Sequence, residues 1–140
     1  MTTRLQRYVD ELYAVVEQVD GFPAAVERST LRAFRRDEHP MLVIHQGREV
    51  ISPDSAWPRS TRVRELLCTV HTAGAERDTS SEEVFEALQP IVIGYVADGL
   101  VQIEELGTDE PKYLQGDLDR MAVTKRFRLT YQTLDDSLSA

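Results

Sequence analysis

The chain has 140 residues, the usual length of one domain, and a chain of this size buries roughly 68–70% of the surface that its unfolded form exposes. Hydrophobic residues make up 41% and charged residues 29%, which excludes a disordered chain. The formal net charge of −8, from 24 acidic and 16 basic residues, argues against duplex nucleic-acid binding as the main role, because such binding depends on clustered Lys and Arg.

Three local features bear on where the protein is made and resides. Cys68 is the only cysteine, so no disulfide can form within the chain, and a reducing cytoplasm is the expected place of synthesis. The first residues run into Asp10 and Glu11 without an apolar block, so we expect no signal peptide. The longest apolar stretch, Ala87–Ala97, is shorter than the roughly 18–20 residues that span a bilayer, so we expect no membrane partner.

The first predicted element is an amphipathic helix. Its apolar residues recur at steps of three and four, at Leu5, Tyr8, Leu12, Val15, Val16 and Val19. Thr2 or Thr3 is the expected N-cap, and Asp20-Gly21 ends the helix. After it, Phe22–Val26 is interpreted as a connector that packs down, and Arg32–Arg36 as an exposed turn or a short strand.

Three strands are predicted before the second helix. Met41–His45 is an apolar run typical of a covered strand. We expect Gly47 to turn the chain, so that Glu49–Ser52 returns antiparallel as a hairpin. The polar loop Ser52–Thr61 follows and carries the only tryptophan. Arg62–Thr72 is the third strand, and three of its residues point to one face, Leu66, Cys68 and Val70.

A capping box, Ser80-Ser81-Glu82-Glu83, predicts the start of the second helix. Apolar residues then continue at helical spacing, at Val84, Phe85, Leu88, Ile91, Val92 and Tyr95. Pro90 lacks an amide hydrogen, so we expect a kink there or two abutting helices. Asp98-Gly99 is the predicted end of this element.

The C-terminal part of the sequence predicts two more strands. Val101–Glu104 alternates as a strand, and the polar segment Gly107–Leu118 is predicted to be a loop. The last strand places two sets of side chains on opposite faces, namely Met121, Val123, Phe127, Leu129 and Tyr131 against Thr124, Arg126, Arg128, Thr130 and Gln132. Asp135–Ala140 is a short polar tail that we expect to fray.

These elements predict one α+β domain over residues 1–140, in the order α-β-β-β-α-β-β. Three strands before the second helix favour a mixed or antiparallel sheet of about four to five strands, with two main helices packed on one face. The other face carries Thr, Arg and Gln, so we expect it to be exposed or covered by another subunit.

No local motif for catalysis, a cofactor or a metal is present. The sequence lacks a phosphate loop, a dinucleotide fingerprint, a GxSxG elbow and an HExxH helix. Cys68 and His71 are three apart on a strand, so they leave opposite faces and do not share a zinc ion. Asp117 and Asp119 resemble the start of a calcium loop, but Met121 occupies the third ligand position. We therefore expect a non-enzymatic protein without a cofactor or a metal.

Trp57 is the residue that suggests a contact surface. It lies between prolines in a polar loop, and tryptophan and arginine are enriched where interfaces bind most strongly. The alternative is that Trp57 folds back onto the sheet. The candidate residues for an assembly interface are Trp57, Arg59, Arg62, Arg64, Arg126 and Arg128.

Several segments together resemble one family. They are Pro40-Met41-Leu42-Val43-Ile44 followed by Glu49, the stretch Arg62–Ala75, the helix from Ser81, and the final R-F-x-L-x-Y-x-T pattern of Arg126–Thr133. This arrangement resembles the tail-terminator (tail-completion, minor tail protein U-like) proteins of long-tailed bacteriophages and prophages. The resemblance covers about Arg32–Leu134.

The resemblance implies a structural subunit of the virion tail, assembled in the bacterial cytoplasm. Its expected partners are other copies of itself in a ring, usually a hexamer, the tail tube protein and a head-completion or connector protein. DNA would be cargo that passes through the lumen, where excess carboxylates would repel it. No catalytic residue is carried over from the family. The alternatives are another non-enzymatic head–tail connector or neck protein, a small hydrolase or nuclease with a dispersed site, and an unrelated α+β binding domain.

Overall fold

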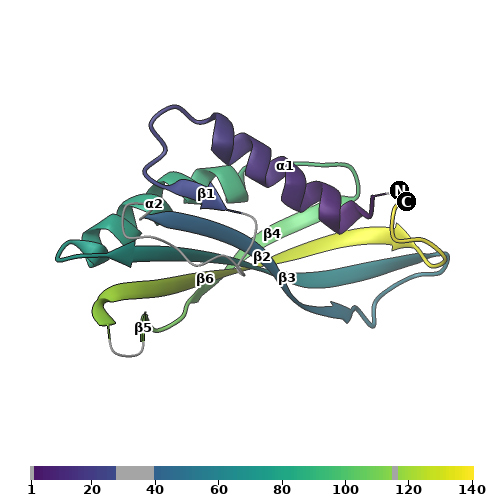
Figure 1. Ribbon diagram of the computed structural model, residues 1–140. Coiled ribbons are helices and arrows are strands. Elements are labelled where there is room, and N and C mark those ends of the chain that lie inside the picture. The colour runs from purple at the N-terminus through teal and green to yellow at the C-terminus, as the bar shows by residue number, and fades with distance from the viewer. Residues whose placement is uncertain (1, 28–39, 115–116) are drawn as a thin grey trace.

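A computed structural model describes residues 2–27, 40–114 and 117–140, in which two helices cover one face of a mixed six-stranded sheet (Figure 1). The α+β class and the predicted packing of both helices on one face are confirmed. The element order also agrees, with one short strand in addition. The elements are α1 (Arg4–Gln18), β1 (Ala25–Glu27), β2 (Met41–Ile51), β3 (Arg59–Ala73), α2 (Arg77–Ile93), β4 (Leu100–Thr108), β5 (Lys112–Leu114) and β6 (Asp117–Leu134).

The strands lie in the order β1-β2-β3-β6-β4, and β5 pairs with β6 outside this path. Strand β1 runs parallel to β2, and every other pairing is antiparallel. The two longest strands form the centre of the sheet, because β3 pairs with β6 along its whole length, from Arg59 opposite Leu134 to Ala73 opposite Arg120. Strand β2 attaches to β3, strands β4 and β5 attach to β6, and β1 attaches to β2.

Helix α1 begins as predicted, but its buried stripe differs from the prediction. The Thr3 hydroxyl accepts a hydrogen bond from the Gln6 amide at 3.1 Å, so Thr3 is the N-cap. Val15 and Val19, predicted to be buried, are exposed. Each residue advances the helix by about 100°, so Val15 falls to the side of the stripe through Leu12 and Val16, and Val19 is the C-cap beyond the last helical residue. The buried stripe comprises Leu5, Tyr8, Val9, Leu12, Tyr13 and Val16.

The predicted connector Phe22–Val26 contains most of a strand that the sequence pattern did not indicate. Strand β1 pairs with the start of β2, with Ala25 opposite Met41. The sequence signal was weak because β1 has only three residues and does not alternate in polarity. The predicted turn or strand at Arg32–Arg36 lies outside the described residues.

The hairpin predicted at Gly47 is wrong. Strand β2 continues to Ile51 with an irregularity between Gln46 and Glu49, and both halves of β2 pair with β3. A side chain at Gly47 would place its Cβ 3.0 Å from the Cβ of Glu65 on β3. The glycine therefore relieves crowding against the neighbouring strand at a bulge, instead of turning the chain.

Both predicted ends of α2 are wrong. The helix starts at Arg77, so the predicted capping box does not form, and Ser81 is buried with its hydroxyl 3.4 Å from that of Thr72. The helix ends at Ile93, not at Gly99, and Gly94 is its C-cap. Pro90 lies inside this single helix, so the alternative of two abutting helices is also wrong.

The predicted loop Gly107–Leu118 contains three strand segments. They are the end of β4, the short β5 and the start of β6. The tail at 135–140, which the sequence predicts to fray, makes backbone hydrogen bonds in the structure. The Asp135 amide donates to the Pro58 carbonyl at 2.8 Å, and the Arg4 amide donates to the Leu138 carbonyl at 2.9 Å.

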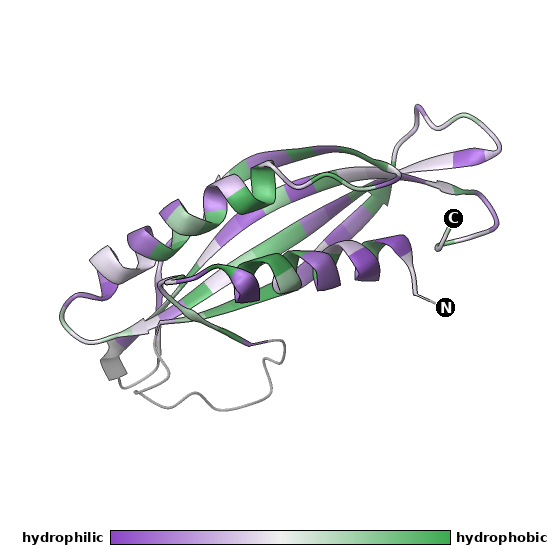
Figure 2. Cartoon of the chain, turned by 90° about the horizontal axis from the view of Figure 1, so that it is seen from above, coloured by the Kyte–Doolittle hydropathy of each residue, from purple (hydrophilic) through white to green (hydrophobic). Residues whose placement is uncertain are grey.

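The main core lies between the helices and the sheet. Figure 2 shows hydrophobic and hydrophilic residues alternating along the strands under the two helices. Burying one large apolar side chain contributes about 1.5–3 kcal/mol, so this layer is the main source of stability. The strand residues of the core are Leu42, Ile44, Leu66, Cys68, Val70, Met121, Val123, Phe127, Leu129 and Tyr131.

Tyr13 joins α1 to the edge of β2 just where β1 ends. Its hydroxyl donates to the Ile44 carbonyl at 2.6 Å and accepts from the Ile44 amide at 2.8 Å. Within the described residues, β1 pairs with β2 as far as Glu27 opposite Val43, and the backbone groups of Ile44 that follow bond to Tyr13. One side chain thus takes the place of a strand residue at a buried position.

We expect Tyr13→Phe to lower the free energy of unfolding by about 1–3 kcal/mol, because it leaves the buried Ile44 amide and carbonyl without that partner. Urea unfolding measures the loss, and hydrogen exchange at the Ile44 amide should speed up. Tyr113→Phe is the matched control, because Tyr113 is 47% exposed, and its effect should stay within about 0.5 kcal/mol. Equal stability of Tyr13→Phe and the unmodified chain would contradict this account.

Candidate assembly surfaces

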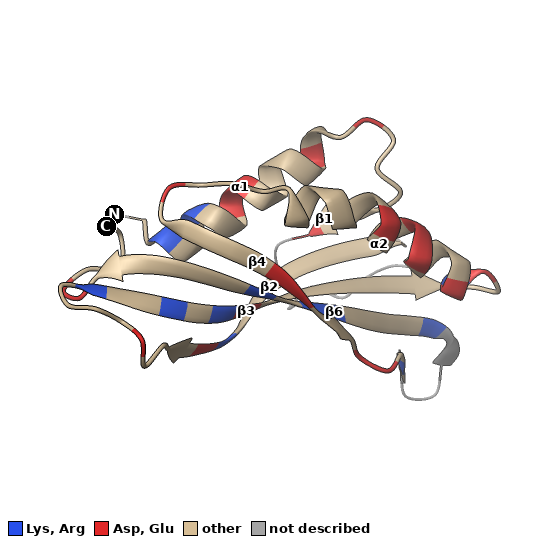
Figure 3. Cartoon of the chain, turned by 180° about the vertical axis from the view of Figure 1, so that it is seen from behind, with Lys and Arg blue, Asp and Glu red and all other residues tan. Residues whose placement is uncertain are grey.

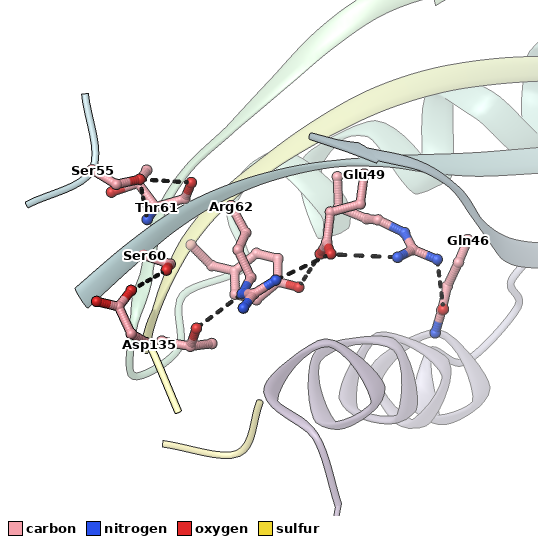
Figure 4. A network of polar contacts seen from close by, with 10 residues as sticks. Gln46, Glu49, Ser55, Ser60, Thr61, Arg62 and Asp135 are labelled. Carbon is pink, nitrogen blue, oxygen red and sulfur yellow. Dashed lines mark hydrogen bonds and ion pairs between the residues drawn. The ribbon is translucent and has the colours of Figure 1, made fainter. Parts of the chain in front are cut away.

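The loop between β2 and β3 is tightly hydrogen-bonded (Figure 4). The Ser52 amide donates to the Thr61 carbonyl at 2.8 Å, and the Thr61 amide donates to the Ser55 hydroxyl at 2.9 Å. The Ser55 hydroxyl donates in turn to the Ser52 carbonyl at 2.7 Å. Ser60 also hydrogen-bonds Asp135 of the C-terminal tail. These hydrogen bonds fix the course of the loop backbone.

Trp57 projects from this loop into solvent. Its side chain is 85% exposed, so the alternative that it folds back onto the sheet is wrong. Val50 and Ile51, at the end of β2, are 47% and 46% exposed, and Arg59 next to the loop is also exposed. An exposed tryptophan on a loop with a fixed backbone is typical of a contact anchor, because little backbone entropy of the loop is left to lose on binding.

Arg62 and Arg64 do not share the surface of Trp57. Side chains alternate along β3, so these two residues lie on the helix-covered side with Leu66. They sit beyond the N-terminal end of α1 and are 13% and 23% exposed. Both arginines are therefore part of the structure's own packing.

Glu49 joins these arginines to the last strand (Figure 4). Its carboxylate lies 3.4 Å from Arg62 Nη1 and 3.9 Å from Arg64 Nη1. It also accepts a hydrogen bond from the Tyr131 hydroxyl at 2.6 Å. Burial, with a smaller contribution from Glu49, raises the pKa of Tyr131, so this hydroxyl stays protonated as the donor. Four side chains thus fix the bulged half of β2 against β3 and β6.

Arg126 and Arg128 lie on the opposite, uncovered face of the sheet. Arg126 contacts Asp109 at 3.0 Å and Glu65 at 3.2 Å, and Arg128 contacts Glu104 at 3.0 Å. The Arg126 guanidinium donates to Asp109 and holds the pKa of that carboxyl below its usual value. The six candidate residues therefore occupy three separate places, with Trp57 and Arg59 at the β2–β3 loop, Arg62 and Arg64 on the covered side, and Arg126 and Arg128 on the uncovered face.

The histidine and cysteine side chains have structural surroundings. His45 Nε2 lies 3.1 Å from the Thr69 hydroxyl on the uncovered face, and burial lowers its pKa. Cys68 faces the core, where complete burial raises the pKa of its thiol to about 12. Within residues 2–27, 40–114 and 117–140, no three His, Cys, Asp or Glu side chains are grouped to hold a metal ion. In the same residues, no helix is long and apolar enough to cross a membrane.

A groove between α1 and α2 was not indicated by the sequence pattern. It has a volume of about 580 Å³ and is lined mainly by apolar groups, including Val15, Ile91, Tyr95 and Val96. Val96 is 85% exposed, and Val15 is 42% exposed. The groove and the Trp57 loop are two exposed surfaces with marked apolar character.

No protein-family model matches the sequence, and no curated protein does. Among solved structures, 28 chains match the fold. One of them belongs to a structure described as "Virion of native gene transfer agent (GTA) particle". It aligns with a TM-score of 0.63 and 15% sequence identity, over 87% of this chain and 92% of that chain. At this identity, the similarity establishes a shared fold.

We expect Arg126→Gln to raise the pKa of Asp109 toward the ordinary value near 3.9, because the variant removes the cation that stabilises the carboxylate. In the unmodified chain, the pKa of Asp109 is lower in the folded state than in the unfolded state. The stabilising effect is thus complete above the unfolded pKa and is lost as the pH falls through the folded pKa. NMR titration of the side-chain carboxyl carbon of Asp109 measures this pKa in the unmodified chain and in Arg126→Gln. Arg128→Gln is the matched control, since Arg128 pairs with Glu104, and an unchanged Asp109 pKa in Arg126→Gln would contradict the assignment.

Proposed function

We propose that this chain is a tail-terminator subunit of a phage-like particle. Copies of the chain form a ring that caps the tail tube, ends tube polymerisation and provides the surface to which the head joins. The observation that carries the proposal is the similarity of fold to a chain of a gene transfer agent virion, over most of both chains. The sequence resemblance to tail-terminator proteins supports it from a separate direction.

The surfaces of the chain support a role in assembly. A ring subunit needs contacts on two sides of the molecule, and the chain has an anchored Trp57 loop and an apolar groove in different places. The ion pairs on the uncovered sheet face leave its charges mutually neutralised. This face is suited to contact with another protein, because charged side chains that enter an interface already paired leave no unpaired buried charge.

The net charge supports DNA as cargo that passes through the ring. The chain carries a formal charge of −8, and Figure 3 shows acidic residues along much of α2. Carboxylates that line a lumen repel the phosphate backbone, so DNA passes without binding to the wall. A non-enzymatic role is consistent with this arrangement.

A second candidate is another head–tail connector or neck protein, because the similar chain belongs to a whole virion and such proteins are part of a virion too. The two roles differ in where the ring docks. A terminator binds the free end of the tail tube, whereas a neck protein binds on the head side.

Deletion of the coding sequence from the genes that encode the particle separates these roles. A terminator predicts tails of unregulated length, measured by electron microscopy, with uniform length restored when the unmodified chain is supplied from a plasmid. Tails of normal length that are not joined to heads would indicate the neck role and contradict the proposal. Normal, fully joined particles would contradict both roles.

A further inference from the structure

The Trp57 loop and the α1–α2 groove are complementary in chemistry but far apart on the chain. The groove runs along the second half of α1, from Glu11 to Gln18. The loop is hydrogen-bonded to the C-terminal tail, which in turn bonds the first residue of α1. Trp57 is therefore near the opposite end of α1 and does not fill the groove of its own chain, as its 85% exposure shows.

The groove has fixed walls. Tyr95 donates a hydrogen bond to the Glu11 carboxylate across the two helices, and its ring packs edge-on against Tyr8 at 6.2 Å between centroids. The groove has a volume of about 580 Å³, which falls within the roughly 300–1,000 Å³ of typical ligand pockets. An apolar groove that is open in the isolated chain can accept an apolar side chain.

Charge favours the same pairing. Among the described residues that line the groove, Glu11 is the only charged one. At the loop the exposed cation is Arg59, two residues from Trp57, whereas Arg62 and Arg64 are held by Glu49.

We propose that the Trp57 loop of one copy inserts into the α1–α2 groove of a second copy. The donor surface and the acceptor surface differ, so each copy can donate to one neighbour and accept from another. Such head-to-tail contacts build rings or filaments, not closed dimers. This inference rests on the proposed ring and deepens it, because it identifies the contact between neighbouring subunits.

Trp57 is the only tryptophan, so its fluorescence reports the contact directly. Its emission should shift to shorter wavelength as the concentration of the unmodified chain rises and assembly proceeds. Trp57→Ala should weaken self-association at least about thirtyfold, which corresponds to the loss of a strong anchor. The double variant Val15→Asp with Val96→Asp should weaken it similarly, and because both valines are exposed, its unfolding curve should match that of the unmodified chain. Val101→Asp, at a position that is 60% exposed on β4, is the control and should assemble normally.

Mixing the two defective chains is the decisive experiment. Trp57→Ala keeps its groove, and the double variant keeps its loop. Neither should assemble alone, but together they should form a one-to-one dimer by light scattering, with a blue shift that comes only from the double variant. Dimers of the double variant alone would indicate contact between two Trp57 loops and overturn the proposal.

Two further outcomes keep this contact distinct from the proposed function. A ring that forms normally from Trp57→Ala overturns the contact and leaves the terminator role intact. An unmodified chain that stays monomeric with constant emission at all concentrations also overturns the contact, while tail length in the deletion strain still decides the terminator role.

Discussion

The pairing of β3 with β6 is the constraint on which the rest of the structure depends. Every residue of β3 has a partner on β6, and this register determines which side chains of both strands face the helices. Leu66, Cys68 and Val70 thereby meet both helices as one apolar surface. A shift of one residue would move this set to the uncovered face, so the register is specified by the core itself.

The same alternation distributes the charged residues. On the covered side, Arg62 and Arg64 lie past the end of α1 and are held by Glu49. On the uncovered side, Arg126 and Arg128 pair with carboxylates of neighbouring strands. Arginines that appear clustered in the sequence are thus used mostly within the chain. The surfaces left for a partner are the anchored Trp57 loop, the groove between the helices and the neutralised sheet face.

The sequence predicted the features that follow from periodicity, namely both helices, the alternating faces of β3 and β6, and the opposite faces of Cys68 and His71. It failed where a neighbouring strand overrides a local signal. Gly47 suggested a turn but relieves crowding against Glu65, and Ser80-Ser81 suggested a cap but lies inside a helix that starts earlier. The groove could not be predicted, because it depends on how two helices pack. The position of Trp57 between prolines in the sequence identified it as a contact candidate, whereas only the structure shows that its side chain is exposed.

The most direct test of the account is the mass and shape of the species that the unmodified chain forms. Light scattering after size-exclusion chromatography, over a range of concentrations and with and without purified tail tubes, gives the mass, and negative-stain images give the shape. The account predicts a closed ring of about six copies with a central hole, free in solution or at tube ends. A chain that remains monomeric in solution and does not bind tube ends would contradict it.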